Sequence, residues 1–132
     1  MGAFASLEEA KEYFQNDLFA MNCGIQIDEL TDDHCLCSMP VTEGLQNAAG
    51  GVMGGALFTL GDFCFAVAAN HRHRTTVAQQ VSVNFLSGTR GKRLFARAAC
   101  KKDGKTTCVY NIDITDDLGR DIAQFIGTGY KL

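Results

Sequence analysis

The sequence predicts an α+β fold in which an antiparallel sheet of about five or six strands wraps around one long central helix. Two observations carry this prediction. Residues 53 to about 69 read MGGALFTLGDFCFAVAA and are almost wholly apolar, and strand-like segments elsewhere outnumber helical ones. The later strand-like segments are joined by tight turns, which favours antiparallel pairing.

The N-terminal region predicts a helix followed by a hairpin. Ser6 and Glu9 have the spacing of a capping box, and apolar residues recur at helical spacing behind them, so we expect one amphipathic helix from residue 7 to about 20. Residues 24–31 and 34–41 then alternate apolar and polar side chains around Asp32-Asp33. This pattern is typical of a two-stranded hairpin, which we expect to end at Pro40 and Gly44.

The apolar stretch predicts a buried helix that follows a loop at residues 45–52. Its longest uncharged run ends at Gly61, far short of the roughly 18 residues that a membrane span needs. A helix that is apolar on every side has to be surrounded, and four later segments supply the wrapper. We expect these strands at residues 75–87, 93–101, 106–113 and 121–131, with Asp103-Gly104 as the turn between the second and third.

A ferredoxin-like fold is the competing architecture. It requires a second long helix in the C-terminal half, where only strand patterns appear. The 132 residues suit one domain, and we expect residues 1–132 to form it.

Composition and cysteine content limit the function. The net charge is −3, with 12 basic and 15 acidic residues, so nucleic acid is not an expected partner. The six cysteines come without a cleavable leader, which favours reduced thiols in the cytoplasm. Cys35 and Cys37 have no second pair to complete a zinc site, and free cysteines usually serve as small buried hydrophobes. We expect no metal and no membrane association.

Two features of the predicted central helix point to chemistry. Asp62 is its one ionisable side chain, and a carboxylate in apolar surroundings is expensive unless it is paired, hydrogen-bonded or used. It either caps a break at Gly61 or takes part in a reaction. Gly54 and Gly55 leave backbone N–H groups bare at the helix start, where they can hold a developing oxyanion or simply permit close packing.

The spacing of these features indicates two chains. Asp62 lies seven residues beyond Gly55, which is about 10 Å along a helix, so one chain cannot direct both groups at one carbonyl. In a symmetric dimer with antiparallel central helices, Gly55 of one subunit can face Asp62 of the other.

Residues 47–62, NAAGGVMGGALFTLGD, resemble the N-x-x-G-x-x-H-G-G…D signature of the hotdog-fold acyl-CoA thioesterases, specifically the phenylacetic-acid-degradation (PaaI-like) group. The resemblance extends over nearly the whole chain. It implies that the Gly55 amide polarises a thioester carbonyl, that Asp62 of the partner subunit acts as base or nucleophile, and that Asn47 positions the reacting groups. Met53 departs from the signature, which has His there.

The resemblance also implies a substrate site. Gly54 lies beside the amide of Gly55, and Gln46, Thr76 and Gln79 are candidates for the role of the missing imidazole. Coenzyme A enters as part of the substrate, with no separate cofactor, and its phosphates need cations. Candidate clusters are Arg72 with Arg74, the loop 90–93 and the turn 102–107, of which the last two are favoured through Arg90, Lys105 and Thr106.

The resulting hypothesis is an acyl-CoA thioesterase that releases free acid and coenzyme A from an aryl- or medium-chain acyl-CoA. It acts as a homodimer or as a homotetramer of two such dimers, and we expect the acyl group near Leu57, Phe58 and Phe65. The alternative is a non-catalytic acyl-CoA binding or sensing protein, which Met53 motivates. A hotdog-fold hydratase is a weaker alternative, because no histidine pairs with Asp62 at helix-facing spacing.

Overall fold

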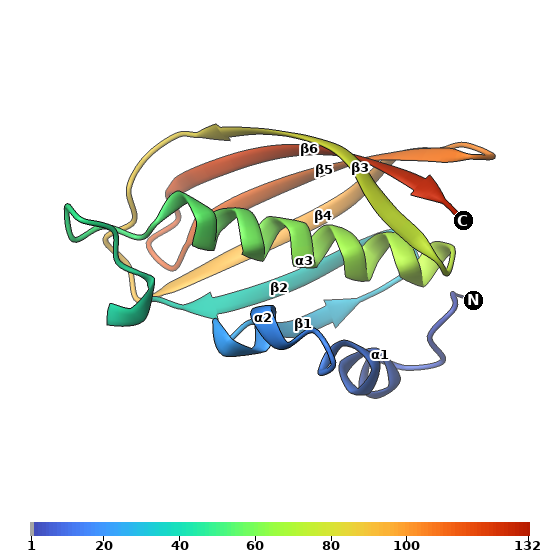
Figure 1. The fold of residues 1–132 in the computed structure, drawn as a ribbon, viewed down its shortest axis with the longest axis horizontal. Helices are drawn as coiled ribbons and strands as arrows, with labels where there is room; N and C mark the ends of the chain where they lie inside the picture. The colour runs from blue at the N-terminus through green and yellow to red at the C-terminus, as the bar shows by residue number, and fades with distance from the viewer. Residues whose placement is uncertain (1) are drawn as a thin grey trace.

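Six antiparallel strands curve around the long helix α3 in the computed structural model, which describes residues 2–132 (Figure 1). The strand order is β1-β2-β4-β5-β6-β3. The helices are α1 (Leu7–Phe14), α2 (Leu18–Asn22) and α3 (Gly54–Arg72), with a 3-10 turn η1 (Glu43–Leu45). The strands are β1 (Gln26–Leu30), β2 (His34–Pro40), β3 (Thr76–Phe85), β4 (Arg93–Asp103), β5 (Thr107–Asp116) and β6 (Asp121–Lys131). The predicted α+β architecture and the central helix are confirmed.

The order of the strands leaves β3 at an edge of the sheet. After β2 the chain passes through α3 and returns as β3 on the far side of β6, while β4, β5 and β6 follow one another as neighbours. One side of β3 pairs with β6 and its other side carries no strand in the part of the chain described. Val77 and Phe85 on β3 are largely exposed. Such an edge invites pairing with another chain.

The core lies between the concave face of the sheet and α3. Alternate residues of β4, β5 and β6 point to the helix and are buried, as period-two strands require. Gly61 allows the closest approach, because a Cβ there would lie 2.6 Å from the ring of Phe125 on β6. The sheet therefore supports α3 through a contact that only glycine permits.

One face of α3 stays open. The residues of the helix that keep partial or full exposure include Gly55, Phe58, Thr59, Asp62 and Ala66. Their spacing puts them on one stripe of the helix surface. The expectation of a helix surrounded on all sides thus holds for the rest of α3, and this stripe is the exception.

The N-terminal helix divides into two, which corrects the prediction of one helix from 7 to about 20. The predicted cap is present, since Ser6 Oγ accepts from the Glu9 N–H at 3.1 Å. The helix ends at Phe14, and Asp17 starts α2 by accepting from the Ala20 N–H at 3.3 Å. The apolar spacing continues through the break, which is why the sequence pattern does not reveal it.

The turn between β4 and β5 also differs from the prediction. Asp103 is still in β4 and pairs with Cys108, while the Gly104 N–H donates to the Thr107 carbonyl at 2.9 Å. The tip of the hairpin is therefore Lys105-Thr106, two residues later than expected.

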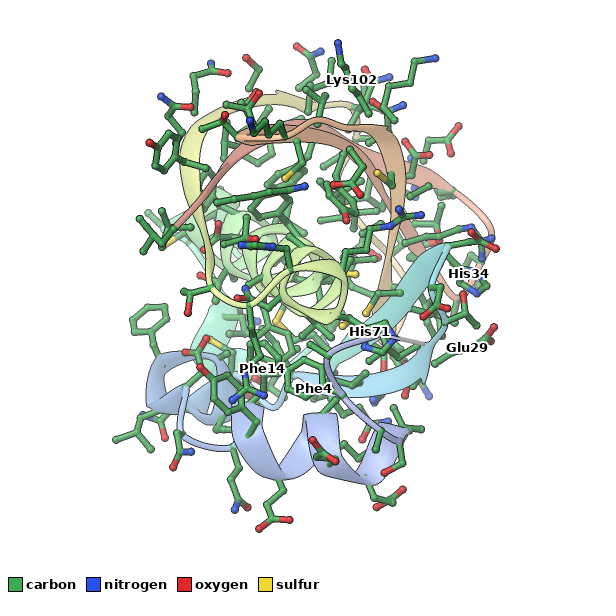
Figure 2. The ribbon with its side chains drawn as sticks, turned by 90° about the vertical axis from the view of Figure 1, so that its right-hand side faces the viewer. Phe4, Phe14, Glu29, His34, His71 and Lys102 are labelled. Carbon is green, nitrogen blue, oxygen red and sulfur yellow. The ribbon has the colours of Figure 1, made fainter. Side chains whose placement is uncertain are left out.

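The segment before α1 covers the C-terminal end of α3 (Figure 2). The Ala3 N–H donates to the His71 carbonyl at 2.6 Å, and the ring of Phe4 stacks on His71 with centroids 5.9 Å apart. Arg74 lies over the Phe4 ring, 5.1 Å from its centroid.

No helix within residues 2–132 has the length and the apolar composition that a membrane span requires.

Candidate active site

The first turn of α3 presents two free backbone donors. Met53 is the N-cap residue and its side chain makes no capping hydrogen bond. Within residues 2–132 the N–H groups of Gly54 and Gly55 have no hydrogen-bond acceptor, whereas those of Ala56 and Leu57 reach the Met53 carbonyl. Free N–H groups at the positive end of a helix dipole are suited to bind a negatively charged oxygen.

The loop before α3 is held by Asn47. Its Oδ1 accepts from the N–H groups of Ala49 at 2.9 Å and Gly51 at 3.1 Å, and Gly50 adopts a φ of +86° that favours glycine. The Met53 N–H then donates to the Leu45 carbonyl at 2.8 Å, which fixes the entry into the helix. Asn47 thus shapes the backbone that presents the free donors.

The approach to Gly55 is open. A Cβ at Gly55 would meet only the end of the Met53 side chain, at an ordinary 3.9 Å. At Gly54 the same atom would lie 3.2 Å from the Phe85 ring, so that side is narrower. Gly55 is exposed and Gly54 is only partly exposed, so a substrate approaches Gly55 more freely than Gly54.

Asp62 lies on the open stripe of α3, two turns after Gly55. Burial, followed by the nearby Asp17 carboxylate, raises the pKa of Asp62 above its ordinary value. A raised pKa makes the ionised carboxylate a better proton acceptor. The spacing of seven residues corresponds to about 10 Å along the helix, so within one chain the two groups stay apart.

Two cavities flank the first turn of α3. The α2 pocket, about 290 Å³, lies between α2, η1 and α3 and is lined by Phe19, Cys23, Leu45, Met53 and Gly55 among others. The β3 pocket, about 400 Å³, is lined by Gly54, Leu57 and Phe85 together with residues 86–89 and others. Sequence reasoning missed Phe19 and Cys23. Phe19 is an apolar residue outside the buried face of its helix, and its side chain is 70% exposed. An apolar residue outside the buried pattern is the signal that the sequence offered for this pocket.

The candidates for the role of the missing imidazole separate in space. Gln46 lines the α2 pocket with Met53 and Gly55. Thr76 is buried after the opposite end of α3, where its hydroxyl donates to the His73 carbonyl and its N–H to Asn70 Oδ1. Gln79 is exposed at an irregularity in the register between β3 and β6. Only Gln46 joins the glycine amides within one chain.

The candidate phosphate-binding cations lie at opposite ends of α3. Arg90 follows the loop that lines the β3 pocket, at the N-terminal end of the helix. Lys105 and Thr106 form the tip of the β4–β5 hairpin at the other end, where Arg72 of α3 meets Asp103 with nitrogen and oxygen 3.4 Å apart. A single chain does not bring these clusters together.

The expected acyl contacts need correction. Phe65 is 2% exposed and packs edge-on against Tyr110, with centroids 5.5 Å apart, so it belongs to the core between helix and sheet. Leu57 is also buried, although it borders the β3 pocket. Phe58 is 38% exposed and packs on Phe125, and of the three it is the one on the open stripe. An apolar helix sequence does not distinguish these faces.

Three cysteines meet in the core. The sulfur atoms of Cys35, Cys37 and Cys64 lie within 4.8 Å of one another, and all three side chains are fully buried. Cys64 donates to the carbonyls of Cys35 and Ala96. The side-chain hydrogen bond between Cys37 and Cys35, followed by the one with Cys64 and by burial, raises the pKa of Cys37. The six cysteines are free thiols. The sequence did not show that Cys64 joins the other two.

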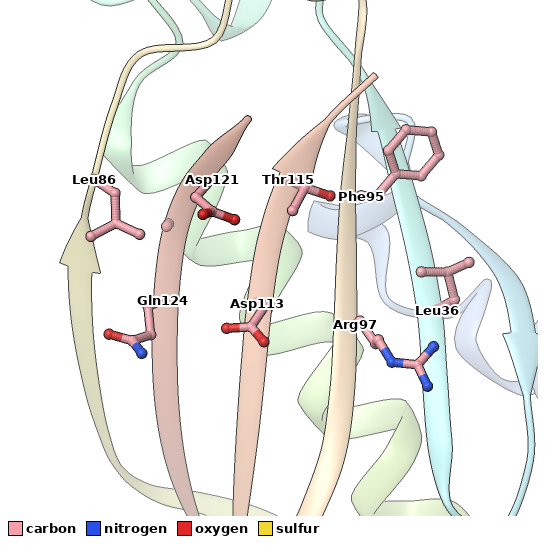
Figure 3. Close-up of a pocket in the computed structure, with 9 residues that line it drawn as sticks. Leu36, Leu86, Phe95, Arg97, Asp113, Thr115, Asp121 and Gln124 are labelled. Carbon is pink, nitrogen blue, oxygen red and sulfur yellow. The ribbon is translucent and has the colours of Figure 1, made fainter. Parts of the chain in front are cut away.

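A larger cavity lies elsewhere, on the face of the sheet away from α3 (Figure 3). It has a volume of about 470 Å³, and Arg97 and Asp113 stand opposite each other on β4 and β5 along its floor. Because Gly55 and Asp62 lie on the other side of the sheet, this cavity is separate from the candidate active site.

Comparisons with known proteins agree with the fold. The model of the thioesterase superfamily matches residues 49–123. Acyl-coenzyme A thioesterase PaaI of Escherichia coli is 32% identical over 126 residues, which cover 95% of this chain and 90% of that protein. The solved structure of E. coli PaaI, from the phenylacetic acid degradation operon, superposes with a TM-score of 0.88 at 29% identity and 96% coverage of both chains.

A second solved structure, that of a hypothetical thioesterase protein of Streptococcus pneumoniae with coenzyme A, has a TM-score of 0.82 at 27% identity. The alignment covers 89% of this chain and 94% of that one. The family match, the PaaI relative and the shared architecture agree with one another. The chain therefore belongs to the hotdog-fold thioesterase superfamily, in its PaaI-like group.

Proposed function

We propose that this protein hydrolyses an aryl- or medium-chain acyl-CoA to the free acid and coenzyme A, at sites shared between two subunits. The observation that carries the proposal is the pair of free N–H groups at the start of α3, with an open approach to Gly55 and a half-buried carboxylate on the same stripe of the helix. The PaaI relative and the coenzyme A complex of the pneumococcal protein support the substrate class.

In the proposed reaction a backbone N–H stabilises the negative charge of the oxyanion, and Asp62 accepts the proton of the attacking water. Water attacks the carbonyl carbon while Asp62 takes its proton, and the Gly55 N–H stabilises the oxyanion that forms. The tetrahedral intermediate collapses, the carbon–sulfur bond breaks and the thiolate of coenzyme A leaves. In the alternative route the Asp62 carboxylate attacks the carbonyl carbon, and the carbon–sulfur bond breaks to release the coenzyme A thiolate. Water then hydrolyses the resulting mixed anhydride, which frees the acid and regenerates the Asp62 carboxylate.

A dimer resolves the distance between the two groups. Among the described residues, the outer edge of β3 carries no strand and one stripe of α3 is exposed. A twofold axis there sets the two α3 helices antiparallel, so that Gly55 of one subunit faces Asp62 of the other. The same operation carries the Lys105-Thr106 tip toward the other subunit's Arg90 loop. A homodimer is therefore the minimum assembly of the proposal, and a homotetramer of two dimers keeps the same sites.

Asn47 is a positioning residue in this proposal. Its contacts to the loop at residues 49–51 hold the backbone that enters α3, and so set the direction of the Gly55 N–H. Met53 supplies no hydrogen-bond donor, and we assign that part to Gln46, a polar side chain that lines the α2 pocket together with Met53 and Gly55. We further propose that residues 1–132 act as one hotdog domain. A cytoplasmic location is supported by the six free thiols.

The first test is hydrolysis of phenylacetyl-CoA and hexanoyl-CoA, followed through the free thiol. Removing the Asp62 carboxylate in Asp62→Asn should reduce kcat by about 10²- to 10⁴-fold, the usual contribution of a general base. Gly55→Pro removes one N–H in the first helical turn, where proline is tolerated, and losing one oxyanion donor costs about 10²- to 10³-fold. Unaltered turnover in Asp62→Asn would exclude this mechanism.

The second test asks whether the site is shared. Asp62→Asn and Gly55→Pro are unfolded together and refolded as a mixture. With random pairing, half of the dimers are mixed and each mixed dimer has one intact composite site, so activity should return to about a quarter of the wild-type value. If both groups act within one chain, the mixture stays as inactive as its components. Size-exclusion chromatography of each variant is the control for assembly.

The second candidate function is acyl-CoA binding without turnover. Met53 favours it, because a thioether at this position cannot donate a hydrogen bond to the carbonyl or to water. No hydrolysis over a broad panel of acyl-CoAs, together with tight binding of the same compounds, would establish this function. Gain of turnover in Met53→His would then identify the missing group.

A further inference from the structure

The two cavities beside the first turn of α3 face different parts of a bound thioester, and we infer that the α2 pocket is the specificity pocket for the acyl group. This inference rests on the proposed function and locates the acyl chain within it. Gly55 lines the α2 pocket and Gly54 lines the β3 pocket. A carbonyl held at these amides therefore lies at the boundary between the cavities, with its two substituents directed to opposite sides.

The charged residues near the two cavities indicate which cavity binds the acyl group and which binds coenzyme A. The residues that line the α2 pocket carry no charged side chain. Three acidic residues, Asp17, Glu43 and Asp62, each lie within three positions in the sequence of a residue that lines it. A pyrophosphate is repelled there. The loop that lines the β3 pocket continues directly into Arg90 and Lys92. The thiol arm and phosphates of coenzyme A thus belong on the β3 side, and the acyl group belongs on the α2 side.

The wall of the α2 pocket is apolar, and a large part of its apolar surface is exposed to water. Phe19 and Met53 are 70% and 56% exposed, and both line this cavity with the half-buried Cys23. An apolar acyl group that fills the pocket removes their surface from water, which favours binding by roughly 25 cal/mol for each Å² buried. A carboxylate at the end of the acyl group would instead be desolvated beside acidic neighbours.

Met53 takes a different part in this arrangement from a catalytic imidazole. The end of its side chain lies beside the open approach to Gly55 and extends the apolar wall to the reacting carbonyl. Phe19, Cys23 and Met53 therefore select uncharged acyl groups large enough to reach α2, such as phenylacetyl or hexanoyl. Acetyl leaves the wall uncovered, and succinyl brings a charge into the pocket.

A matched pair of variants on α2 tests the inference. Leu18 and Phe19 are neighbours with 71% and 70% exposure, and Phe19 lines the pocket while Leu18 is not among its lining residues. Phe19→Ala should lower kcat/KM for hexanoyl- and phenylacetyl-CoA by about tenfold, the lower end of what lost apolar contacts cost in a pocket. Activity on acetyl-CoA should change less than twofold, and Leu18→Ala should keep the wild-type profile.

Binding of hexyl-CoA, a thioether that cannot be hydrolysed, gives a readout that does not depend on turnover. Wild type should bind it more tightly than coenzyme A, and Phe19→Ala should lose most of that difference while Leu18→Ala keeps it. Equal effects of the two variants on both readouts, or a wild-type preference for succinyl-CoA, would overturn the pocket. Wild-type protein that binds hexyl-CoA with this pattern but hydrolyses nothing refutes the proposed hydrolysis and leaves the pocket standing.

Discussion

Replacing Gly61 by alanine tests the contact that seats α3 on the sheet. The new methyl group would lie 2.6 Å from the Phe125 ring, whereas ordinary contact begins at 3.4 Å. Helix or ring has to move by roughly 0.8 Å, the difference between these distances, and Phe125 is only 1% exposed. Such overpacking costs about 1–3 kcal/mol, and the gain in helix propensity from glycine to alanine returns about 1 kcal/mol.

Gly55→Ala is the matched control, because it makes the same chemical change in the same helix where the nearest side-chain atom is at 3.9 Å. Equilibrium urea unfolding at one protein concentration compares the two. We expect Gly61→Ala to have a free energy of unfolding about 1–3 kcal/mol below that of Gly55→Ala, since the difference isolates the clash. If Gly61→Ala equals or exceeds Gly55→Ala in stability, α3 does not approach β6 as described.

Three further predictions concern charge and capping. Because burial raises the pKa of Asp62, its carboxylate lowers stability at neutral pH, so Asp62→Asn should raise Tm at pH 7 and lose that advantage as pH falls through the raised pKa. Ser6→Ala should lower the free energy of unfolding by about 1 kcal/mol in urea, through loss of the α1 cap. Burial opposes ionisation of Asp116, but hydrogen bonds from the Arg120 N–H and the Thr89 hydroxyl hold its pKa below the ordinary value. Asp116→Asn should therefore lower Tm at pH 7, and the deficit should shrink as acid titrates Asp116 in the wild type. An unchanged Tm for Asp116→Asn at pH 7 would contradict the role of these bonds.

The sequence was most informative where a pattern was long. The apolar run after Met53 and the alternating segments after Thr75 predicted the central helix and its sheet, because burial imposes a period on many residues at once. The break before α2 was missed, although Asp17 is a good N-cap residue. Phe14 before the break is buried, whereas Leu18, the next apolar residue at helical spacing, is 71% exposed. The apolar period therefore runs on past the point where the burial of α1 ends.

The candidate site could be predicted only in part, for a physical reason. Gly54, Gly55 and Asp62 belong to one helix, so the sequence alone predicts the distances between them along that helix. Phe19 and Cys23 reach the same place from another element, and Phe65 turns away into the core. These positions depend on how α2 and the sheet pack against α3, which a single sequence does not record.

The fully buried thiols at residues 35, 37 and 64 can report when the core of the protein opens. They lie between β2 and α3, so an alkylating reagent reaches them only when the helix and this part of the sheet separate. Cys23 and Cys100 are partly accessible and should react first, in the folded state. The later labelling, counted by mass spectrometry over time, would measure how often the core opens without any substitution in the protein.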